Sequence, residues 1–187
     1  MAVREHRLEG ARQVESPNFD ERPGGASDIS LLVIHGITLP PGDFGGPDVE
    51  NLFLNRLDPQ AHPYFATISH LKVSTHLFIR RDGELVQFVP FDKRAWHAGK
   101  SEFRGREVCN DFSIGIELEG TDDGPYEDIQ YRRLLQVTAA LLVAYPTLAL
   151  DRIRGHSDIA PGRKTDPGPF FDWERYRRGL AALPLVS

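Results

Sequence analysis

Cysteine is nearly absent from this sequence, and its scarcity limits the cross-links and metal sites that the chain can form. Cys109 is the single cysteine among 187 residues, so an intramolecular disulfide is excluded. Zinc sites built mainly from thiolates need several cysteines and are excluded for the same reason. Any metal ion must therefore be held by histidine, aspartate or glutamate side chains.

The sequence also lacks an excess of positive charge. It contains 22 lysines and arginines against 27 aspartates and glutamates, which gives a formal net charge of -5 at pH 7. Proteins that bind nucleic acid or acidic lipid without specificity need a broad positive field. We therefore expect neither nucleic acid nor a membrane as a partner.

A long hydrophobic segment is missing as well. The longest largely apolar stretch, residues 138–150, is too short to span a bilayer and is interrupted by Tyr145-Pro146. The first 25 residues mix acidic and basic side chains and contain no apolar run of the kind that a secretory signal requires. These features predict a cytoplasmic protein.

The length and the even composition favour one domain. A chain of this size can bury roughly 70% of the surface that it exposes when unfolded, so it needs no metal or disulfide merely to fold. The sequence has no internal repeat, no low-complexity tract and no long flexible linker. We predict a single domain over residues 1–187, in which residues 1–28 form a mostly irregular N-terminal arm.

Three segments have the patterns of β-strands. Residues 29–34 are a mostly apolar, β-branched run typical of a strand buried on both faces, which we expect to end at His35-Gly36. Residues 75–89 contain an Asp-Gly pair between two strand-like runs, which predicts a β-hairpin. Residues 112–119 alternate strictly, so we expect one face in the core and the acidic face to be exposed or functional.

Helices are expected in three other segments. Apolar residues at helical spacing and an acidic first turn predict the main helix over residues 127–145. Shorter helices are predicted at residues 48–56 and 173–180, the second capped by Asp172. The predicted hairpin must be antiparallel, and strands and helices do not alternate regularly. We therefore predict an α+β (mixed α/β) fold with a central mixed β-sheet flanked by helices.

Two histidines end short strand-like segments, where side chains can point into the crevice beyond a sheet. These are His35 and His156, and the loop rich in proline and glycine that follows His156 carries two aspartates, Asp158 and Asp166. Two histidines and one carboxylate make three ligands of a catalytic zinc site, which leaves the fourth position for a water whose pKa falls to about 7. The alternative is that both are core or rim histidines and that the loop is a solvated connection.

Four segments, taken in order, resemble those of a known enzyme family. They are Leu32-Val33-Ile34-His35, Trp96-His97-Ala98-Gly99, residues 110–120 and residues 155–168. Together they resemble the type-2 N-acetylmuramoyl-L-alanine amidases over nearly the whole chain. The resemblance implies zinc-dependent hydrolysis of the amide bond between the lactyl group of 1,6-anhydro-N-acetylmuramic acid and L-alanine. The substrate would be a muropeptide recycled in a bacterial cytoplasm, and its removal would also limit β-lactamase induction.

The same resemblance implies the role of each site residue. It makes His35, His156 and Asp166 the ligands of one zinc ion. It also makes Glu117 the general base and Lys164 the cation that stabilises the oxyanion. The chemistry of the residues agrees, because burial of Glu117 near the like charge of Glu119 would raise its pKa toward that of a working base. Lys164 precedes Asp166 by two positions, so an extended loop would send both side chains to one side.

Substrate contacts are expected from four residues: Trp96, Lys72, Gly36 and Arg163. Trp96 could offer a flat face to a sugar ring or pack in the core. The two cations could meet carboxylates of the stem peptide, or could simply be solvated. Gly36 directly follows the first ligand, at a position where similar amidases often have asparagine, so the resemblance implies that one substrate hydrogen bond is missing here.

Two other functions use similar residues. Two histidines and a carboxylate also hold ferrous iron in oxygenases, but those sites usually begin with a His-x-Asp/Glu motif that is missing here. Peptidoglycan recognition proteins share the amidase fold, and many lack a zinc ligand and catalysis. Because all three ligands, Glu117 and Lys164 are present, we predict an enzyme, active as a monomer, with a non-catalytic recognition module as the alternative.

Overall fold

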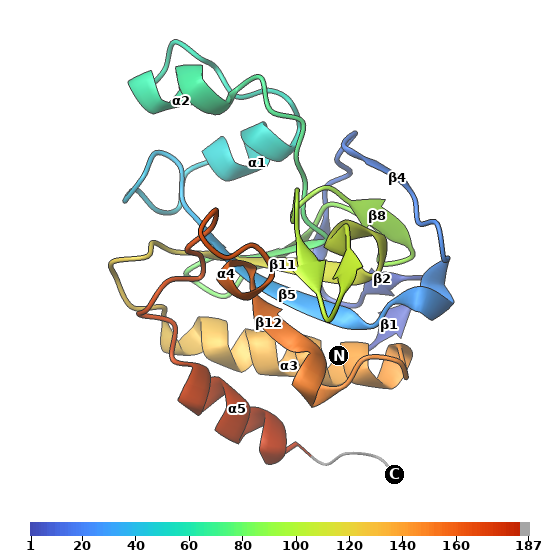
Figure 1. The fold of residues 1–187 in the computed structure, drawn as a ribbon. Coiled ribbons are helices and arrows are strands. Elements are labelled where there is room, and N and C mark those ends of the chain that lie inside the picture. Colours follow the sequence, from blue (N-terminus) through green and yellow to red (C-terminus); the bar gives the residue numbers. More distant parts are fainter. Residues whose placement is uncertain (184–187) are drawn as a thin grey trace.

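The computed structural model describes residues 1–183 and has a β-sheet at its centre (Figure 1). Within these residues the sheet has six strands in the order β12-β5-β11-β6-β7-β3. In that order their bounds are Ile153–Gly155, Leu31–Ile37, Ser113–Glu119, Leu77–Ile79, Leu85–Gln87 and Arg12–Gln13. Strands β12, β5, β11 and β6 are parallel, whereas β6 and β7 form an antiparallel hairpin. The predicted mixed sheet and hairpin are confirmed.

Helices and short strand pairs surround this sheet. The α-helices α1 to α5 span Asp48–Phe53, Pro63–Ile68, Asp128–Ala144, His156–Ile159 and Trp173–Ala181. The 3-10 helices η1 to η3 span Ala26–Asp28, Cys109–Asp111 and Leu150–Arg152. The short strand pairs are β1 (Val3–Arg4) with β2 (Arg7–Leu8), β4 (Phe19–Glu21) with β8 (Lys93–Ala95), and β9 (Glu102–Phe103) with β10 (Arg106–Glu107). No helix in residues 1–183 is long and apolar enough to cross a membrane.

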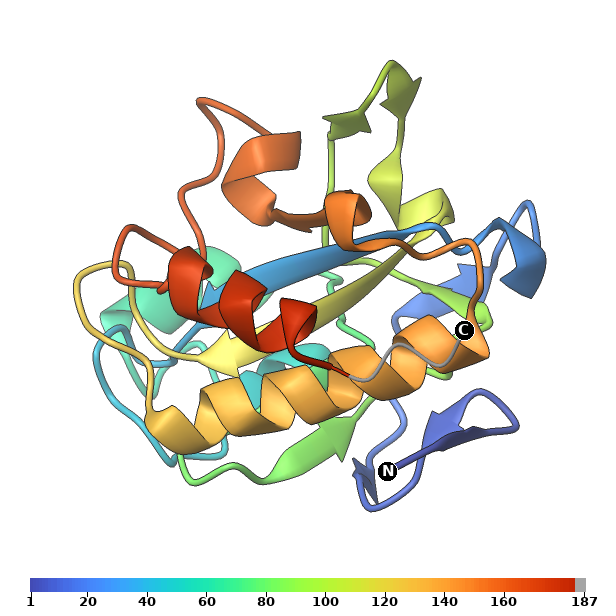
Figure 2. The ribbon, with the colours of Figure 1, turned by 90° about the horizontal axis from the view of Figure 1, so that it is seen from below.

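Helices α3 and α5 lie together on one face of the sheet (Figures 1 and 2). Alternate residues of β5 and β11 point to this side and form one hydrophobic core with the buried side of α3. A capping box joins Glu127 and Gln130 at the start of α3, and the Asp172 side chain accepts a hydrogen bond from the Arg175 amide at the start of α5. The main and final helices are therefore found where the sequence predicted them.

The opposite face of β11 is also covered, so that of the two alternatives expected for it, exposed or functional, the exposed one is wrong. All seven residues of β11 are buried. Part of the cover is the segment around Ala98, which packs with Val33 and α4 in a separate hydrophobic cluster. The His97 ring lies so close to Gly115 that a Cβ atom there would be 2.5 Å from His97 Cγ. Polar residues on this face of β11 are therefore enclosed by loops that the alternation pattern could not reveal.

The N-terminal arm is fixed to the sheet by a buried arginine. Residues 1–28 contain strands β1 to β4 and η1, and Arg22 within them is buried. Its guanidinium donates hydrogen bonds to five main-chain carbonyl groups, those of Phe91, Lys93, Asn110, Asp111 and Ser113. Burial lowers the pKa of Arg22 to about 10. These bonds join the arm to the segments that surround the candidate site.

Candidate active site

The candidate site lies across three parallel strands whose register brings distant residues together. Strand β5 lies between β12 and β11, and His35 of β5 is paired with Glu117 of β11. On the other side Ile34 is paired with Gly155, and His156 follows as the first residue of α4. The predicted end of this strand is corrected by one residue, because β5 continues past His35-Gly36 to Ile37. The continued pairing with β11 places His35 inside the sheet.

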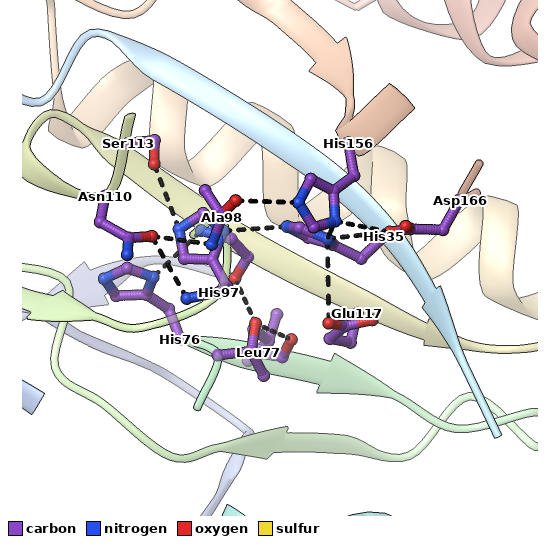
Figure 3. A network of polar contacts seen from close by, with 12 residues as sticks. His35, His76, Leu77, His97, Ala98, Asn110, Ser113, Glu117, His156 and Asp166 are labelled. Carbon is purple, nitrogen blue, oxygen red and sulfur yellow. Dashed lines mark hydrogen bonds and ion pairs between the residues drawn. The ribbon is translucent and has the colours of Figure 1, made fainter. Parts of the chain in front are cut away.

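Three side chains converge on one point, as Figure 3 shows. The Nδ1 atoms of His35 and His156 are 3.0 Å apart, and Asp166 Oδ2 lies 3.0 Å and 3.1 Å from them. Tetrahedral zinc with bonds of about 2.0–2.1 Å would place its ligands roughly 3.3 Å apart, which is close to these separations. The two ring nitrogens and the carboxylate oxygen all face one another. They need a proton or a cation between them, because their lone pairs repel. The residues therefore fit a metal site.

The remaining ring nitrogens of both histidines have protein partners. His35 Nε2 lies 2.9 Å from His97 Nδ1, and His156 Nε2 lies 3.1 Å from the carbonyl oxygen of Ala98. Because the carbonyl can only accept, His156 can donate a proton to it from Nε2, which leaves Nδ1 free when a metal is bound. This is the arrangement usually found for histidine ligands, whose second nitrogen donates to a protein acceptor.

The protonation states of these groups suit a cation. Burial lowers the pKa of His35 to about 4, with partial opposition from the hydrogen bond to Asp166. Burial acts to raise the pKa of Asp166, but the hydrogen bonds from His156 and His35 outweigh it and hold that pKa well below its ordinary value. At neutral pH the site therefore contains a neutral imidazole and a carboxylate, the forms that bind metal ions.

Glu117 stands beside this cluster as a buried carboxylate with one unsatisfied oxygen. Its residue is 8% exposed, Oε1 lies 3.9 Å from His35 Nδ1, and Oε2 has no hydrogen-bond partner within residues 1–183. Burial raises the pKa of Glu117 well above its ordinary value, the charge of Asp166 raises it further, and Lys164 opposes both. A carboxylate in these surroundings takes up a proton readily.

The acidic neighbour that affects Glu117 differs from the one expected. The sequence suggested Glu119, but the carboxylate of Glu119 accepts hydrogen bonds from the main-chain amides of Gly45 at 2.6 Å and Arg81 at 2.9 Å. Asp166 supplies the like charge instead. Glu119 thus fixes the loop that follows β5 and the turn of the hairpin, and it has no direct part in the cluster.

A cleft of about 730 Å³ opens beside the cluster. Glu117, His156, Asp166 and Lys164 border it together, as the short spacing of the last two in sequence suggested. One wall is apolar and comes mainly from α1, α2 and the residues after α2: Leu52, Phe53, Tyr64, Ile68, Leu71 and Val73. Polar residues also line the cleft, including Thr121, Asp122 and Asp123. The cleft can therefore contact a ligand that has both apolar and polar groups.

The four expected substrate contacts lie in different places. Gly36 and the half-buried Trp96 line the cleft, and a Cβ atom at Gly36 would collide with the hydroxyl of Tyr126. Lys72 is exposed and is absent from the residues of the described chain that line the cleft. The guanidinium of Arg163 donates hydrogen bonds to the carbonyl oxygens of Ala98 and Lys100. Arg163 thus ties the loop that bears Asp166 to the segment that supports His156.

Sequence reasoning gave no role to two polar residues of the site. His97 contacts His35, and the Tyr126 hydroxyl donates a 2.9 Å hydrogen bond to the carbonyl oxygen of Pro167, beside Asp166. His97 belongs to one of the segments that carry the family resemblance, which was the available signal. Tyr126 lies in a polar loop with no pattern, so only the folded chain identifies it.

Comparison with known families decides what kind of site this is. Residues 25–169 match the family described as N-acetylmuramoyl-L-alanine amidase. The chain belongs to this family. The matched range includes the whole cluster of His35, Glu117, His156 and Asp166, and the amidase predicted from the sequence is confirmed at the level of the family.

Several relatives resemble the chain over most of its length. The 1,6-anhydro-N-acetylmuramyl-L-alanine amidase AmpD of Escherichia coli K12 is 62% identical over 170 residues, 91% of this chain and 92% of the relative. The AmpD of Haemophilus influenzae is 55% identical over 169 residues, 90% of this chain and 91% of the relative. Our chain is therefore comparable in extent to these amidases.

Solved structures agree with the fold. A crystal structure of a selenomethionine AmpD derivative has a TM-score of 0.93 and 59% identity, covering 96% of this chain and 99% of that one. The amidase AmiD of E. coli, in complex with anhydro-N-acetylmuramic acid-L-Ala-D-gamma-Glu-L-Lys, has a TM-score of 0.61 and 30% identity. It covers 81% of this chain and 57% of that one. The predicted α+β amidase fold is confirmed.

Proposed function

We propose that this protein is a zinc-dependent amidase that hydrolyses the bond between the lactyl group of 1,6-anhydro-N-acetylmuramic acid and L-alanine in muropeptides. One observation carries the proposal: three ligand atoms of His35, His156 and Asp166 meet within 3.1 Å of one another beside the unsatisfied carboxylate of Glu117. The names of the AmpD relatives supply the substrate class.

His35, His156 and Asp166 would hold the zinc ion. A bound zinc ion would polarise the amide carbonyl and activate the attacking water. Glu117 removes a proton from that water, because its buried carboxylate has an unsatisfied oxygen and a raised pKa. Glu117 then delivers the proton to the departing amine of L-alanine. One residue thus acts first as base and then as acid, and no acyl-enzyme forms.

Lys164 supplies positive charge to the same side of the cleft. Its charge opposes the rise in the pKa of Glu117 and helps to lower that of His35, so it acts on both groups electrostatically. We assign it the stabilisation of the oxyanion that develops on the carbonyl oxygen. A fixed donor at such a position typically contributes roughly 10²–10³-fold to turnover.

Substrate contacts follow from the positions of the side chains in and near the cleft. Trp96 and Gly36 line the cleft and would contact the sugar and the lactyl group. Lys72 and Arg163 would meet carboxylates of the stem peptide, although Arg163 already donates to two main-chain carbonyls. Action as a monomer in a bacterial cytoplasm, within peptidoglycan recycling, stays a prediction of the sequence.

The proposed function is tested by zinc content and by release of free peptide from anhydromuramoyl-tripeptide, before and after chelation. We expect one equivalent of zinc per chain, and cleavage that chelation abolishes and zinc restores. The non-anhydro muropeptide serves as a second substrate. Bound zinc without cleavage of either substrate would favour the recognition module, and a protein that does not bind zinc would contradict the assignment of the ligands.

Replacing Lys164 should lower turnover without removing zinc. We expect Lys164→Ala to reduce kcat by about 10²–10³-fold, because the oxyanion loses the cation assigned to it. Lys100→Ala is a suitable control, because Lys100 is exposed and does not line this cleft within residues 1–183. The measurement is kcat and zinc content for both variants. Unchanged kcat in Lys164→Ala would contradict the oxyanion role.

A further inference from the structure

His97 forms the middle of a hydrogen-bonded chain that starts at a metal-binding histidine. Its Nδ1 lies 2.9 Å from His35 Nε2, and its Nε2 lies 3.1 Å from the hydroxyl of Ser113 (Figure 3). His97 itself is not one of the three residues whose ligand atoms converge. Its contacts therefore concern the orientation of His35.

The direction of these hydrogen bonds follows from the ligand geometry. His35 Nδ1 faces His156 and Asp166, so it must present a lone pair when a metal ion is bound. The proton of the neutral His35 ring is then on Nε2, which donates to Nδ1 of His97. The His97 proton is in turn on Nε2, which donates to the hydroxyl oxygen of Ser113. Each ring in the chain has one defined tautomer.

The position of His97 is fixed from two sides. The main-chain amides of His97 and Ala98 both donate to Oδ1 of Asn110, at 3.2 Å and 2.8 Å. On the other side Gly115 leaves room for the ring, because a Cβ atom there would be 2.5 Å from His97 Cγ. A bulkier residue at this position of β11 would displace the ring from His35.

The adjacent residue supports the second histidine ligand. The carbonyl oxygen of Ala98 accepts a 3.1 Å hydrogen bond from His156 Nε2 and a 2.5 Å bond from Arg163. Two consecutive residues of one segment therefore contact both histidines, the first through its side chain and the second through its main chain.

We infer that His97 is a positioning residue for zinc binding, which holds His35 in the orientation and tautomer that direct Nδ1 to the metal, while the Ala98 carbonyl does the same for His156. This inference rests on the proposed zinc site. Loss of such an acceptor next to a ligand typically weakens metal binding by about 10–100-fold. The main chain of Ala98 cannot be removed by substitution, whereas the side chain of His97 can.

Two variants of similar size separate hydrogen bonding from packing. Asparagine places its Oδ1 near the position of the histidine Nδ1, so His97→Asn retains an acceptor for His35 Nε2. Leucine fills a similar volume without an acceptor. We expect His97→Leu to weaken zinc binding by about 10–100-fold, and His97→Asn to remain within a few-fold of the native protein.

Zinc affinity is measured by competition with a chromophoric chelator, and thermal unfolding of the metal-free proteins shows whether each variant is folded. His70→Leu is the control for loss of an exposed histidine. The Nε2 proton of His35 is followed in ¹H–¹⁵N correlation spectra of the zinc-saturated proteins. We expect a hydrogen-bonded, slowly exchanging Nε2 proton in the native protein and in His97→Asn, and a rapidly exchanging one in His97→Leu.

The outcomes distinguish this inference from the proposed function. If the native protein binds zinc and His97→Leu binds it equally well with unchanged exchange of the His35 Nε2 proton, the positioning role is wrong and the amidase proposal stands. If both His97 variants lose zinc equally, the ring acts through packing and the inference is also wrong. Failure of the native protein to bind zinc would overturn both.

Discussion

Glu117→Gln should lower turnover by about 10²–10⁴-fold while the protein retains one equivalent of zinc. Glutamine has nearly the shape of glutamate but cannot accept a proton, so the variant loses the general base and keeps the packing of β11. Glu117 lies outside the set of converging ligand atoms, which is why zinc content should not change. The measurement is kcat for release of free peptide, together with zinc analysis of the same sample.

Glu119→Gln is the matched control for this variant, because Glu119 is a buried carboxylate on the same face of β11. Its hydrogen bonds to Gly45 and Arg81 concern the loops at that end of the sheet, so we expect a smaller loss of kcat. Native turnover in Glu117→Gln, or a larger loss in Glu119→Gln, would contradict the assignment of the base.

Glu117→Gln should also make the metal-free protein more stable at neutral pH. The pKa of Glu117 is raised in the folded state, so the folded protein binds this proton more tightly than the unfolded chain. Below the unfolded pKa of about 4.3 both states are protonated, and stability falls as the pH rises through the folded pKa. We therefore expect metal-free Glu117→Gln to unfold at a higher temperature than the native protein at pH 7.5, and the difference to shrink toward pH 4.

Asp166→Asn should remove both zinc binding and activity. Asp166 is the single anionic member of the converging cluster, and its carboxylate lies 3.0 Å and 3.1 Å from the two ring nitrogens. A neutral amide oxygen binds zinc poorly, so we expect sub-stoichiometric zinc after dialysis and peptide release at the background rate. The measurement is zinc content by elemental analysis, with activity before and after addition of excess zinc.

Asp123→Asn controls for loss of a negative charge elsewhere in the cleft. Asp123 lines the same cleft but does not belong to the converging cluster. The Asp123→Asn protein should therefore keep one equivalent of zinc. A full equivalent of tightly bound zinc in Asp166→Asn would show that a different residue completes the site.

Segments with strong local signals were predicted correctly from the sequence. The Asp-Gly turn fixed the β6–β7 hairpin, and helical spacing with an acidic first turn fixed α3. These signals act between residues close in the chain, so they do not depend on the rest of the fold. The end of β5 was placed one residue too early, because Ile37 is in the strand through its pairing with Glu119 of β11, which is a long-range contact.

Burial on both faces of β11 could not be predicted from alternation. A strand with polar residues on one face usually exposes that face to water. Here the polar face is covered by loops from other parts of the chain, and its residues find partners there: Ser113 at His97, and Glu119 at the amides of Gly45 and Arg81. The source of the raised pKa of Glu117 was misassigned for the same reason, since Asp166 is 49 positions away in sequence.

By itself the sequence determined which chemistry is available to this protein. A single cysteine excluded thiolate zinc sites, and the ordered segments around His35, Glu117 and His156 identified the amidase family. Only the tertiary structure decided how these groups act together. The register of β12, β5 and β11, together with the loop after α4, brings side-chain atoms of His35, His156 and Asp166 within 3.1 Å of one another, and one segment beside Gly115 contacts both histidines. The physical reason is that metal geometry, burial and pKa depend on distances between side chains that are far apart in the sequence, and the folded chain alone fixes those distances.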